Sequence, residues 1–186
     1  MFISGNGTNL QSIIDDGIEV ALVFSDQPSA FGLERAKKAN IKTCVIDKAD
    51  FRGRRKEYTK KIVEVLKENE IELIVLAGFM TIFSADIFDD FSDRMLNTHP
   101  SLLPAFTGTY GLGTMTATLE AGVKVTGVTV HIVTPEVDAG PILAQAEVPV
   151  LDGDDEHILL ERIQKVEHVL YPQTIRQYSV KLKENK

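Results

Sequence analysis

The chain has 186 residues, 44% of them hydrophobic, and a formal net charge of −7. This length and apolar content suit one soluble domain with a full core, so we expect a single domain over residues 1–186. The acidic balance argues against a nucleic-acid partner, because binding a phosphate backbone calls for a basic surface. No apolar run approaches the roughly 20 residues that a membrane helix needs, so no membrane is expected as a partner either.

The single cysteine, Cys44, excludes an internal disulfide and is typical of a reducing compartment such as the cytoplasm. It lies in the apolar run KTCVI, which predicts a buried strand residue rather than a nucleophile. The four histidines and Cys44 do not have the spacing of metal ligands, so the sequence predicts no metal.

The chain opens on SGNGTNLQSII, residues 4–14, which predicts a glycine turn leading into a helix capped by Thr8 or Asn9. Only residues 1–3 precede it, so the first strand must be short. A helix N-terminus offers free backbone N–H groups that suit an anion such as phosphate. The turn could equally serve packing alone, and it is neither a dinucleotide fingerprint nor a P-loop.

Strand and helix patterns then alternate along the chain, which is typical of a parallel sheet covered on both faces. The second half carries two longer strand patterns and a last helix, which Pro172 is expected to kink or break. The prediction is an α/β fold: a Rossmann-like, mostly parallel twisted sheet with helices on both faces, mixed toward its C-terminal strands. Strands are expected over 19–25, 42–47, 72–78, 94–99, 124–133 and 141–150, and helices over 30–40, 54–70 and about 155–181.

The stretch MLNTHPSLLP, residues 95–104, ends a hydrophobic strand on an amide and an imidazole. Side chains alternate along a strand, so Asn97 and His99 should project to one side, roughly 7 Å apart, and Thr98 to the other. Ligands of parallel α/β sheets bind beyond the carboxyl ends of the strands, where this pair lies. An amide donor beside an imidazole can stabilise an oxyanion and move a proton. The alternative is that His99 is only a structural strand-end histidine.

A carboxylate near His99 would orient the ring and raise its pKa, and TPEVDAGPI, residues 134–142, supplies Asp138. Asp138 could also serve only the turn. The other histidines are weaker candidates, since His131 shares a strand face with Thr129 while His157 and His168 belong to the last helix.

These segments resemble the phosphoribosylglycinamide formyltransferase (GAR transformylase) family, folate-dependent enzymes of purine synthesis. The resemblance rests on SGNGTNLQ, FSDQPSAFGLERA, LAGFM, MLNTHPSLLPAF, AGVKVTGVTVHIV, VDAGPILAQAEVPV and EHVLYP, which occur in the family's order over nearly the whole chain. It implies direct attack of the glycinamide ribonucleotide amine on the formyl carbon of 10-formyltetrahydrofolate, the co-substrate, with no covalent enzyme intermediate. Asn97 and an imidazolium at His99 would stabilise the tetrahedral intermediate, and Asp138 would keep His99 protonated.

The resemblance also implies a phosphate-binding half, residues 1–96, and a catalytic and folate-closing half, residues 97–186. Its implied binding residues fall into two groups. Those for the ribonucleotide are Gly7, Thr8, Asn9, Gln164 and Glu167; those for the folate are Arg55, Met80, Thr81, Ile82, Phe83, Thr134, Pro135, Glu136 and Val137.

The sequence departs from the family's pattern in three places. The first strand is clipped, and Thr81 stands where the family usually has a basic residue. The segment TGTYGLGTMTATLEAG, which begins at Thr107, lacks the usual proline and is about three residues longer than the family's turn; its glycines and threonines predict a mobile lid over 107–118.

Two other functions remain open at this stage. A formyltetrahydrofolate deformylase would pass the formyl group to water, although that enzyme carries a further regulatory domain. A catalytically impaired binding protein would hold folate and sugar phosphate without turnover. A transfer-RNA formyltransferase is disfavoured by the absence of a basic surface. The partners expected are small molecules, and we expect the protein to be a monomer or a homodimer.

Overall fold

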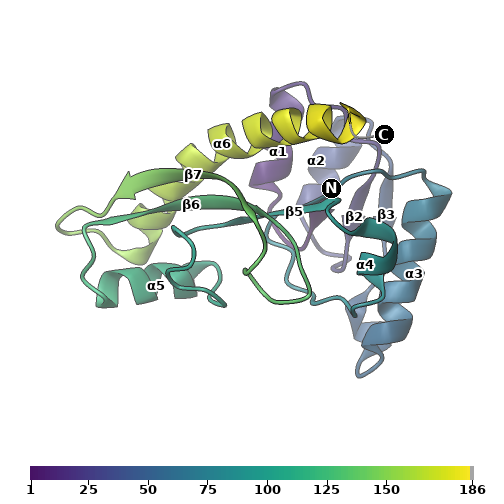
Figure 1. Ribbon diagram of the computed structural model, residues 1–186, viewed down its shortest axis with the longest axis horizontal. Helices are drawn as coiled ribbons and strands as arrows, with labels where there is room; N and C mark the ends of the chain where they lie inside the picture. Colours follow the sequence, from purple (N-terminus) through teal and green to yellow (C-terminus); the bar gives the residue numbers. More distant parts are fainter. Residues whose placement is uncertain (185–186) are drawn as a thin grey trace. The chain divides into compact units, whose positions relative to one another are not determined.

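The computed structural model describes residues 1–184 and contains one sheet of seven strands in the order β3-β2-β1-β4-β5-β6-β7 (Figure 1). Strands β1 to β3 pair in parallel, as do β1 and β4, whereas β6 and β7 are antiparallel. The predicted α/β fold, with a mostly parallel sheet that becomes mixed at its C-terminal strands, is confirmed. The strands are β1 (Phe2–Ile3), β2 (Val23–Ser25), β3 (Thr43–Val45), β4 (Ile74–Leu76), β5 (Met95–His99), β6 (Val125–Ile132) and β7 (Ile142–Pro149).

The contacts within the chain divide it into two compact units, Met1–Leu96 and Asn97–Lys186. The first unit contains the strands β1 to β4 and the helices α1 (Thr8–Asp15), α2 (Gly32–Lys38), η1 (Lys48–Phe51), α3 (Arg55–Glu68) and α4 (Ile87–Phe91). The second contains most of β5, the strands β6 and β7, and the helices α5 (Leu112–Glu120) and α6 (Glu156–Glu184). Within residues 1–184, no helix is both long and apolar enough to span a membrane.

Strands β1 and β2 present their residues to two different layers. Ile3 and Val23 pack with Leu10 of α1 and Leu33 of α2 in one cluster. The ring of Phe2 lies on the opposite side of β1 and contacts Phe24, with ring centroids 4.6 Å apart. The period-two alternation of a strand therefore accounts for the burial of both faces.

The strands of this unit are shorter than predicted. Strand β2 was expected over 19–25 but has only Val23–Ser25, and β1 offers it only Phe2 and Ile3 for pairing. Cys44, expected to be buried, is half-buried in β3. Burial nevertheless raises the pKa of its thiol, which favours the protonated form.

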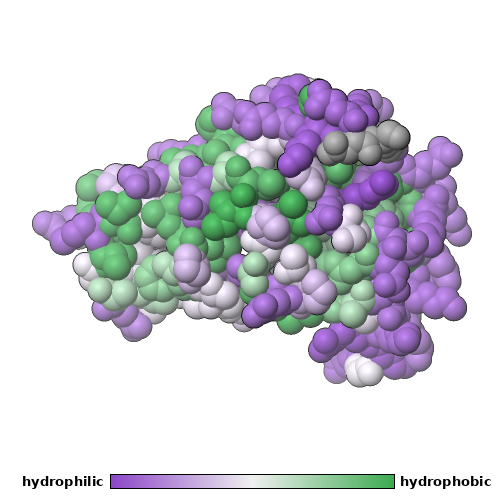
Figure 2. Space-filling view, viewed as in Figure 1, coloured by the Kyte–Doolittle hydropathy of each residue, from purple (hydrophilic) through white to green (hydrophobic). Residues whose placement is uncertain are grey.

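Helix α3 shows the amphipathic pattern that the sequence predicts. Tyr58, Ile62 and Leu66 are buried, one helical turn apart, while charged side chains occupy the outer face. Figure 2 shows this outer face as a hydrophilic surface.

The glycine turn before α1 is held by a close backbone contact. Gly7 is the N-cap residue and has a φ of 68°, a left-handed conformation that disfavours a side chain. A Cβ at Gly7 would lie 2.7 Å from the Cα of Gly32, at the start of α2. The predicted capping by Thr8 or Asn9 is wrong, because Gly7 takes the N-cap position and no side chain caps the helix.

The second unit is built on the β6–β7 hairpin, with α5 and α6 packed on it. Val128 and Val148 of the hairpin join Met115 of α5 and Leu159 and Ile163 of α6 in one buried cluster. The antiparallel register runs from Val125 opposite Pro149 to His131 opposite Ile142, with an irregularity between Val130 and His131.

The mobile lid predicted over 107–118 is wrong for most of its length, because helix α5 begins at Leu112. Thr114, Met115 and Thr118 are buried, and the Thr118 hydroxyl donates to the Thr114 carbonyl at 2.8 Å. Threonines at this spacing satisfy their hydroxyls on the helix's own carbonyls, so a threonine-rich segment can pack as a helix.

Of the kink or break predicted at Pro172, the break does not occur, because α6 runs from Glu156 to Glu184 through this residue. Proline removes one helical hydrogen bond. Tyr171 and Pro172 are both buried, and the burial of these apolar rings offsets that loss.

We expect Gly7→Ala to lower the free energy of unfolding by about 1–3 kcal/mol, because it adds both a left-handed strain and a clash with Gly32. Gly5→Ala is the matched control, since a Cβ there meets nothing within 4 Å. Chemical denaturation of both variants measures the difference. Equal stabilities of the two variants would contradict this account of the turn.

Candidate active site

The end of β5 sends consecutive side chains to opposite sides, as predicted. Asn97 and His99 both join a polar cluster with Asp138, described below. Thr98 is buried on the other side, where its hydroxyl donates to Glu167 Oε1 of α6 at 2.8 Å. Neighbouring residues of β5 therefore lie in two different polar environments, one on each side of the strand.

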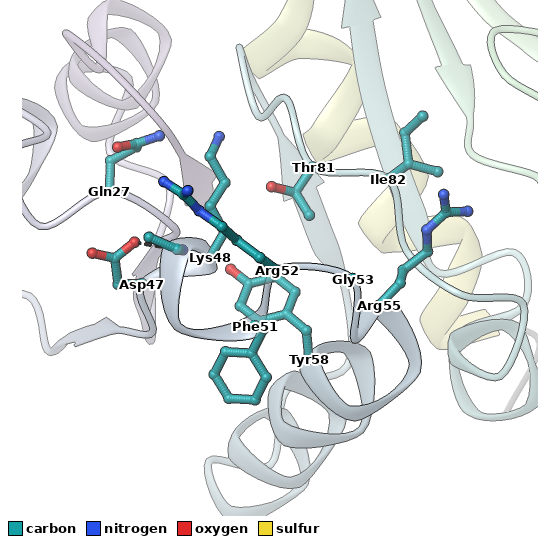
Figure 3. Close-up of a pocket in the computed structure, with 11 residues that line it drawn as sticks. Gln27, Asp47, Lys48, Phe51, Arg52, Gly53, Arg55, Tyr58, Thr81 and Ile82 are labelled. Atoms are coloured by element: carbon teal, nitrogen blue, oxygen red, sulfur yellow. Dashed lines mark hydrogen bonds between the residues drawn. The ribbon is translucent and has the colours of Figure 1, made fainter.

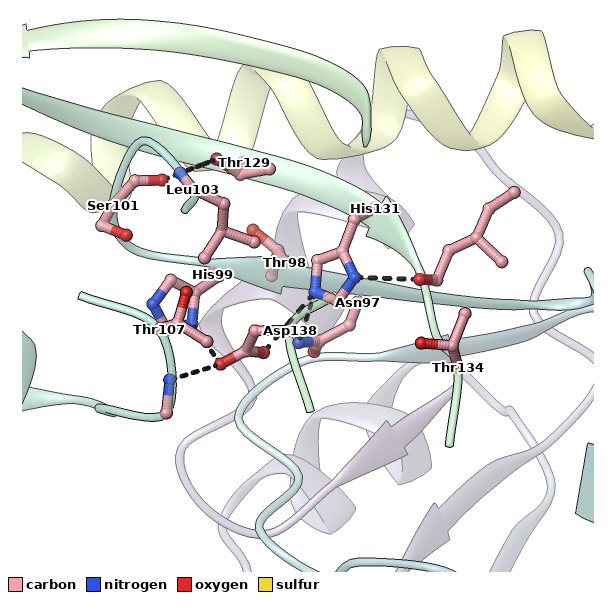
Figure 4. Close-up of polar contacts among 12 residues, drawn as sticks. Asn97, Thr98, His99, Ser101, Leu103, Thr107, Thr129, His131, Thr134 and Asp138 are labelled. Atoms are coloured by element: carbon pink, nitrogen blue, oxygen red, sulfur yellow. Dashed lines mark hydrogen bonds and ion pairs between the residues drawn. The ribbon is translucent and has the colours of Figure 1, made fainter. Parts of the chain in front are cut away.

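Asp138 lies against the imidazole of His99, with 3.5 Å between Oδ2 and Nδ1, and both side chains are at least nine-tenths buried (Figure 4). Nε2 of the same ring lies 3.3 Å from the carbonyl oxygen of Phe106. Asp138 Oδ2 also accepts a hydrogen bond from the backbone N–H of Gly108 at 3.0 Å. Each ring nitrogen of His99 thus faces an acceptor oxygen. A protonated ring has an N–H at both nitrogens and can donate a hydrogen bond to each acceptor.

Burial nevertheless lowers the pKa of His99 below its ordinary value of 6.5, and the nearby Asp138 carboxylate raises it only in part. Asp138 thus raises the pKa of His99, as the sequence predicts, and burial is the larger of the two effects. The cost of removing an imidazolium from water exceeds the attraction of one carboxylate here.

His131 belongs to the same cluster, although the sequence analysis ranked it as a weak candidate. Its Nδ1 lies 3.0 Å from the carbonyl oxygen of Ile132, to which it can only donate, so Nε2 is the accepting nitrogen of the neutral ring. Nε2 accepts from the side-chain amide of Asn97 at 3.3 Å and lies 3.7 Å from Asp138 Oδ1. His131 therefore orients the amide of Asn97.

The loop between β6 and β7 carries Asp138 and the predicted folate-closing residues. Thr134 Oγ1 donates to the carbonyl of Glu136 at 3.0 Å, and Val137 is exposed. Pro135 and Glu136 are exposed as well. A Cβ at Gly140 would lie 1.8 Å from the carbonyl oxygen of Ile132, so the loop returns tightly against the end of β6. That contact holds Asp138 close to His131.

Of the predicted ribonucleotide-binding residues on α6, Glu167 is buried and Gln164 is half-buried. Glu167 already accepts the Thr98 hydroxyl through Oε1. Gln164 and Glu167 lie one helical turn apart, as predicted. The hydrogen bond from Thr98 connects α6 to β5.

The glycine turn in the first unit contains the predicted phosphate-binding residues Gly7, Thr8 and Asn9 at the start of α1. Arg35 of α2 lies against this turn, where its Nε donates to the Asn6 carbonyl at 2.8 Å and its Nη1 to Gln11 at 3.2 Å. These acceptors are neutral, so the guanidinium adds positive charge to the helix N-terminus. Sequence reasoning missed Arg35, because only the fold brings α2 to the turn.

The predicted folate-binding residues of the first unit are divided between a pocket and the core. Arg55, Thr81 and Ile82 line a pocket of about 630 Å³ (Figure 3), and Met80 is 44% exposed. The side chain of Phe83 instead stacks on Phe79 in the aromatic cluster, with centroids 5.6 Å apart. Phe83 can therefore offer only its backbone to a ligand.

Comparison with known proteins places this chain in a family. Residues 1–175 match the formyl transferase family model, and the chain belongs to that family. The Escherichia coli phosphoribosylglycinamide formyltransferase is 41% identical over 194 residues, a match that covers 100% of this chain and 90% of that protein. The crystal structure of glycinamide ribonucleotide transformylase 1 from Symbiobacterium toebii is 44% identical with a TM-score of 0.88, and covers 94% of this chain and 84% of that one.

Longer relatives match as well. The trifunctional purine biosynthetic protein adenosine-3 of Drosophila melanogaster is 43% identical over 183 residues, and the match covers 94% of this chain but only 13% of that protein. The chain thus corresponds to a small part of that larger protein and to nearly all of the Escherichia coli one.

We expect an NMR titration of the His99 ring, assigned against His99→Gln, to give a pKa below 6.5, and Asp138→Asn to lower it further by removing the carboxylate that raises it. A ring protonated more weakly when folded binds fewer protons than in the unfolded chain, so its contribution to stability is lost as pH falls below 6.5. A pKa above 6.5, or one unmoved by Asp138→Asn, would refute this assignment of charge.

Proposed function

We propose that this chain transfers the formyl group of 10-formyltetrahydrofolate to the amine of glycinamide ribonucleotide in purine biosynthesis. The observation that carries the proposal is the cluster of Asn97, His99 and Asp138. It occurs in a chain that is 41% identical to the Escherichia coli formyltransferase over the whole length of this chain. The substrates are small molecules, and we infer neither a nucleic acid nor a membrane as partner. The enzyme acts in the cytoplasm as one formyltransferase domain, a monomer or a homodimer, and needs no metal.

The reaction begins with attack of the ribonucleotide amine on the formyl carbon, which gives a tetrahedral intermediate with an anionic oxygen and a positively charged nitrogen. The Asn97 amide donates one hydrogen to His131 and keeps its second for the anionic oxygen. A donor that is already oriented stabilises this charge without reorganising during the reaction.

His99 acts on the proton of the attacking amine. Because burial lowers its pKa, His99 is largely neutral before the reaction and has a nitrogen that can accept this proton. Asp138 then stabilises the imidazolium. The proton passes to N10 as the bond between N10 and the formyl carbon breaks, which releases tetrahydrofolate and leaves the formyl group on the amine.

The remaining predicted residues bind the substrates. Gly7, Thr8, Asn9 and the neighbouring Arg35 suit the ribonucleotide phosphate, because backbone N–H groups and a guanidinium favour an anion. Gln164 and Glu167 serve the ribose or the amine. The folate is held by Arg55 and the backbone or side chains of residues 80–83, and by the loop 134–137.

A hydrolytic transfer to water, as in a deformylase, uses the same three side chains and is the second candidate. The phosphate-suited turn favours a phosphorylated acceptor over water. A binding protein without turnover is the third, and the hydrogen-bonded cluster argues against it.

We expect consumption of 10-formyltetrahydrofolate, followed by absorbance, to require glycinamide ribonucleotide. Asn97→Ala should reduce turnover about a hundredfold or more, because it removes an oxyanion donor. His157→Ala is the control, since His157 is an exposed histidine of α6. Turnover without the ribonucleotide would establish the deformylase, and binding of both ligands without turnover would establish the binding protein.

A further inference from the structure

The segment that begins at Thr107 departs from the family's pattern and has no role in the proposed reaction. One of its threonines, Thr109, makes two contacts through its side-chain oxygen. This oxygen lies 2.6 Å from the carbonyl oxygen of Phe106 and 2.9 Å from the hydroxyl oxygen of Thr114 in α5. A hydroxyl has one hydrogen and a carbonyl can only accept, so Thr109 donates to Phe106 and accepts from Thr114. Thr109 therefore connects α5 to the Phe106 carbonyl.

The donor to Thr109 is fixed in the core of the second unit. Thr114 is fully buried, and the next residue, Met115, belongs to the buried cluster of α5, α6 and the hairpin. The backbone carbonyl of Thr114 also accepts the Thr118 hydroxyl at 2.8 Å. The Thr109 hydroxyl therefore has a well-packed partner, although the residues on either side of it, 108 and 110, are exposed.

The Phe106 carbonyl belongs to a residue with an unfavourable backbone conformation. Phe106 has a φ of 59°, in the left-handed region that disfavours a residue with a side chain. Such a conformation persists only where surrounding contacts hold it. Thr109 supplies two of these contacts, since its backbone N–H donates to the same carbonyl at 3.3 Å in addition to its hydroxyl. Thr109 therefore determines where this carbonyl points.

The Phe106 carbonyl in turn faces the ring of His99. Nε2 of His99 lies 3.3 Å from this oxygen. Because a carbonyl only accepts, the hydrogen bond requires a proton on Nε2, and in a neutral ring Nδ1 then has the free lone pair. Nδ1 lies 3.5 Å from Oδ2 of Asp138 (Figure 4). A proton that arrives at Nδ1 therefore forms the imidazolium directly beside a carboxylate.

We propose that Thr109 is a positioning residue for His99, because it holds the Phe106 carbonyl that keeps the proton of the neutral ring on Nε2. Nδ1 is then the nitrogen that takes the proton of the attacking amine before that proton passes to N10. The inference rests on the proposed function, since it assigns one nitrogen of His99 to a step of that reaction. Thr109 acts through Phe106 and is not itself a catalytic residue.

The test compares Thr109→Val, which removes the hydroxyl and keeps the side-chain shape, with Thr109→Ser, which keeps the hydroxyl. Nitrogen-15 NMR of the protein above the pKa of His99, assigned against His99→Gln, reports which ring nitrogen has the proton. We expect Nε2 to be protonated in most molecules of the unmodified protein and of Thr109→Ser. Thr109→Val should raise the fraction protonated at Nδ1 about twofold or more, because Nε2 loses a fixed acceptor.

Thr107→Val is the matched control, because the Thr107 hydroxyl belongs to the same loop but donates to the Pro104 carbonyl at 2.8 Å. It should leave the tautomer unchanged. In turnover, Thr109→Val should lower kcat about tenfold with nearly unchanged KM for both substrates, because the orientation of a proton acceptor affects the chemical step rather than binding. Thr109→Ser should retain the unmodified kcat.

Protonation of Nδ1 in the unmodified protein, or a tautomer that Thr109→Val leaves unchanged, would overturn the proposal. An equal shift in Thr107→Val or in Thr109→Ser would overturn it too, because the loop would then matter without the hydroxyl. If Thr109→Val does not fold, Thr109→Ala makes the same comparison with a smaller side chain. The tautomer is measured without substrate, so it stands whether or not formyl transfer is observed, whereas failure of the proposed function would appear as absence of turnover in the unmodified protein.

Discussion

The constraint on which the second unit depends is the period-two alternation at the end of β5. One residue step sends Asn97 and His99 to the cluster with Asp138, and Thr98 to the buried Glu167. A register shift of one residue would exchange these environments, with Thr98 in the reacting cluster and the imidazole against a buried carboxylate. The buried contact of Thr98 with Glu167 therefore also determines that Asn97 and His99 face the cluster with Asp138.

Desolvation is the largest influence on the pKa of His99 in that cluster. The His99 ring has an acceptor at each nitrogen, yet burial keeps its pKa below the ordinary value. In the proposed mechanism the ring begins neutral and accepts the proton of the attacking amine. In that mechanism Asp138 limits the cost of the protonated state. Its backbone is left-handed, with a φ of 53°, and the same loop returns tightly against Ile132 at Gly140.

The sequence could predict the elements that depend on local pattern. The alternation in MLNTH, the apolar runs and the glycine turn led to the α/β fold, which is confirmed. At the end of β5, His99 contacts Asp138, and Asn97 contacts His131 beside them. His131 was ranked too low because its contact with Asn97 depends on the position of β6 beside β5 in the sheet. Arg35 was missed for the same reason, since no local pattern shows which helix approaches the turn.

The predictions of a lid and of a helix break were wrong because they relied on local residue types and took no account of tertiary packing. Threonines and glycines suggested a lid where buried Thr114 and Met115 stabilise a helix, and Pro172 suggested a break where its burial permits continuity. In both places tertiary contacts outweighed local propensity.

The most direct test of the account is a double-mutant cycle on kcat/KM for formyl transfer, with Asn97→Ala, His99→Ala and the double variant. If the amide and the imidazole act together on one tetrahedral intermediate, the double variant should be no more than about tenfold worse than the poorer single variant. If the two losses instead multiply in full, the side chains act independently, and the account of a shared site at the end of β5 is contradicted.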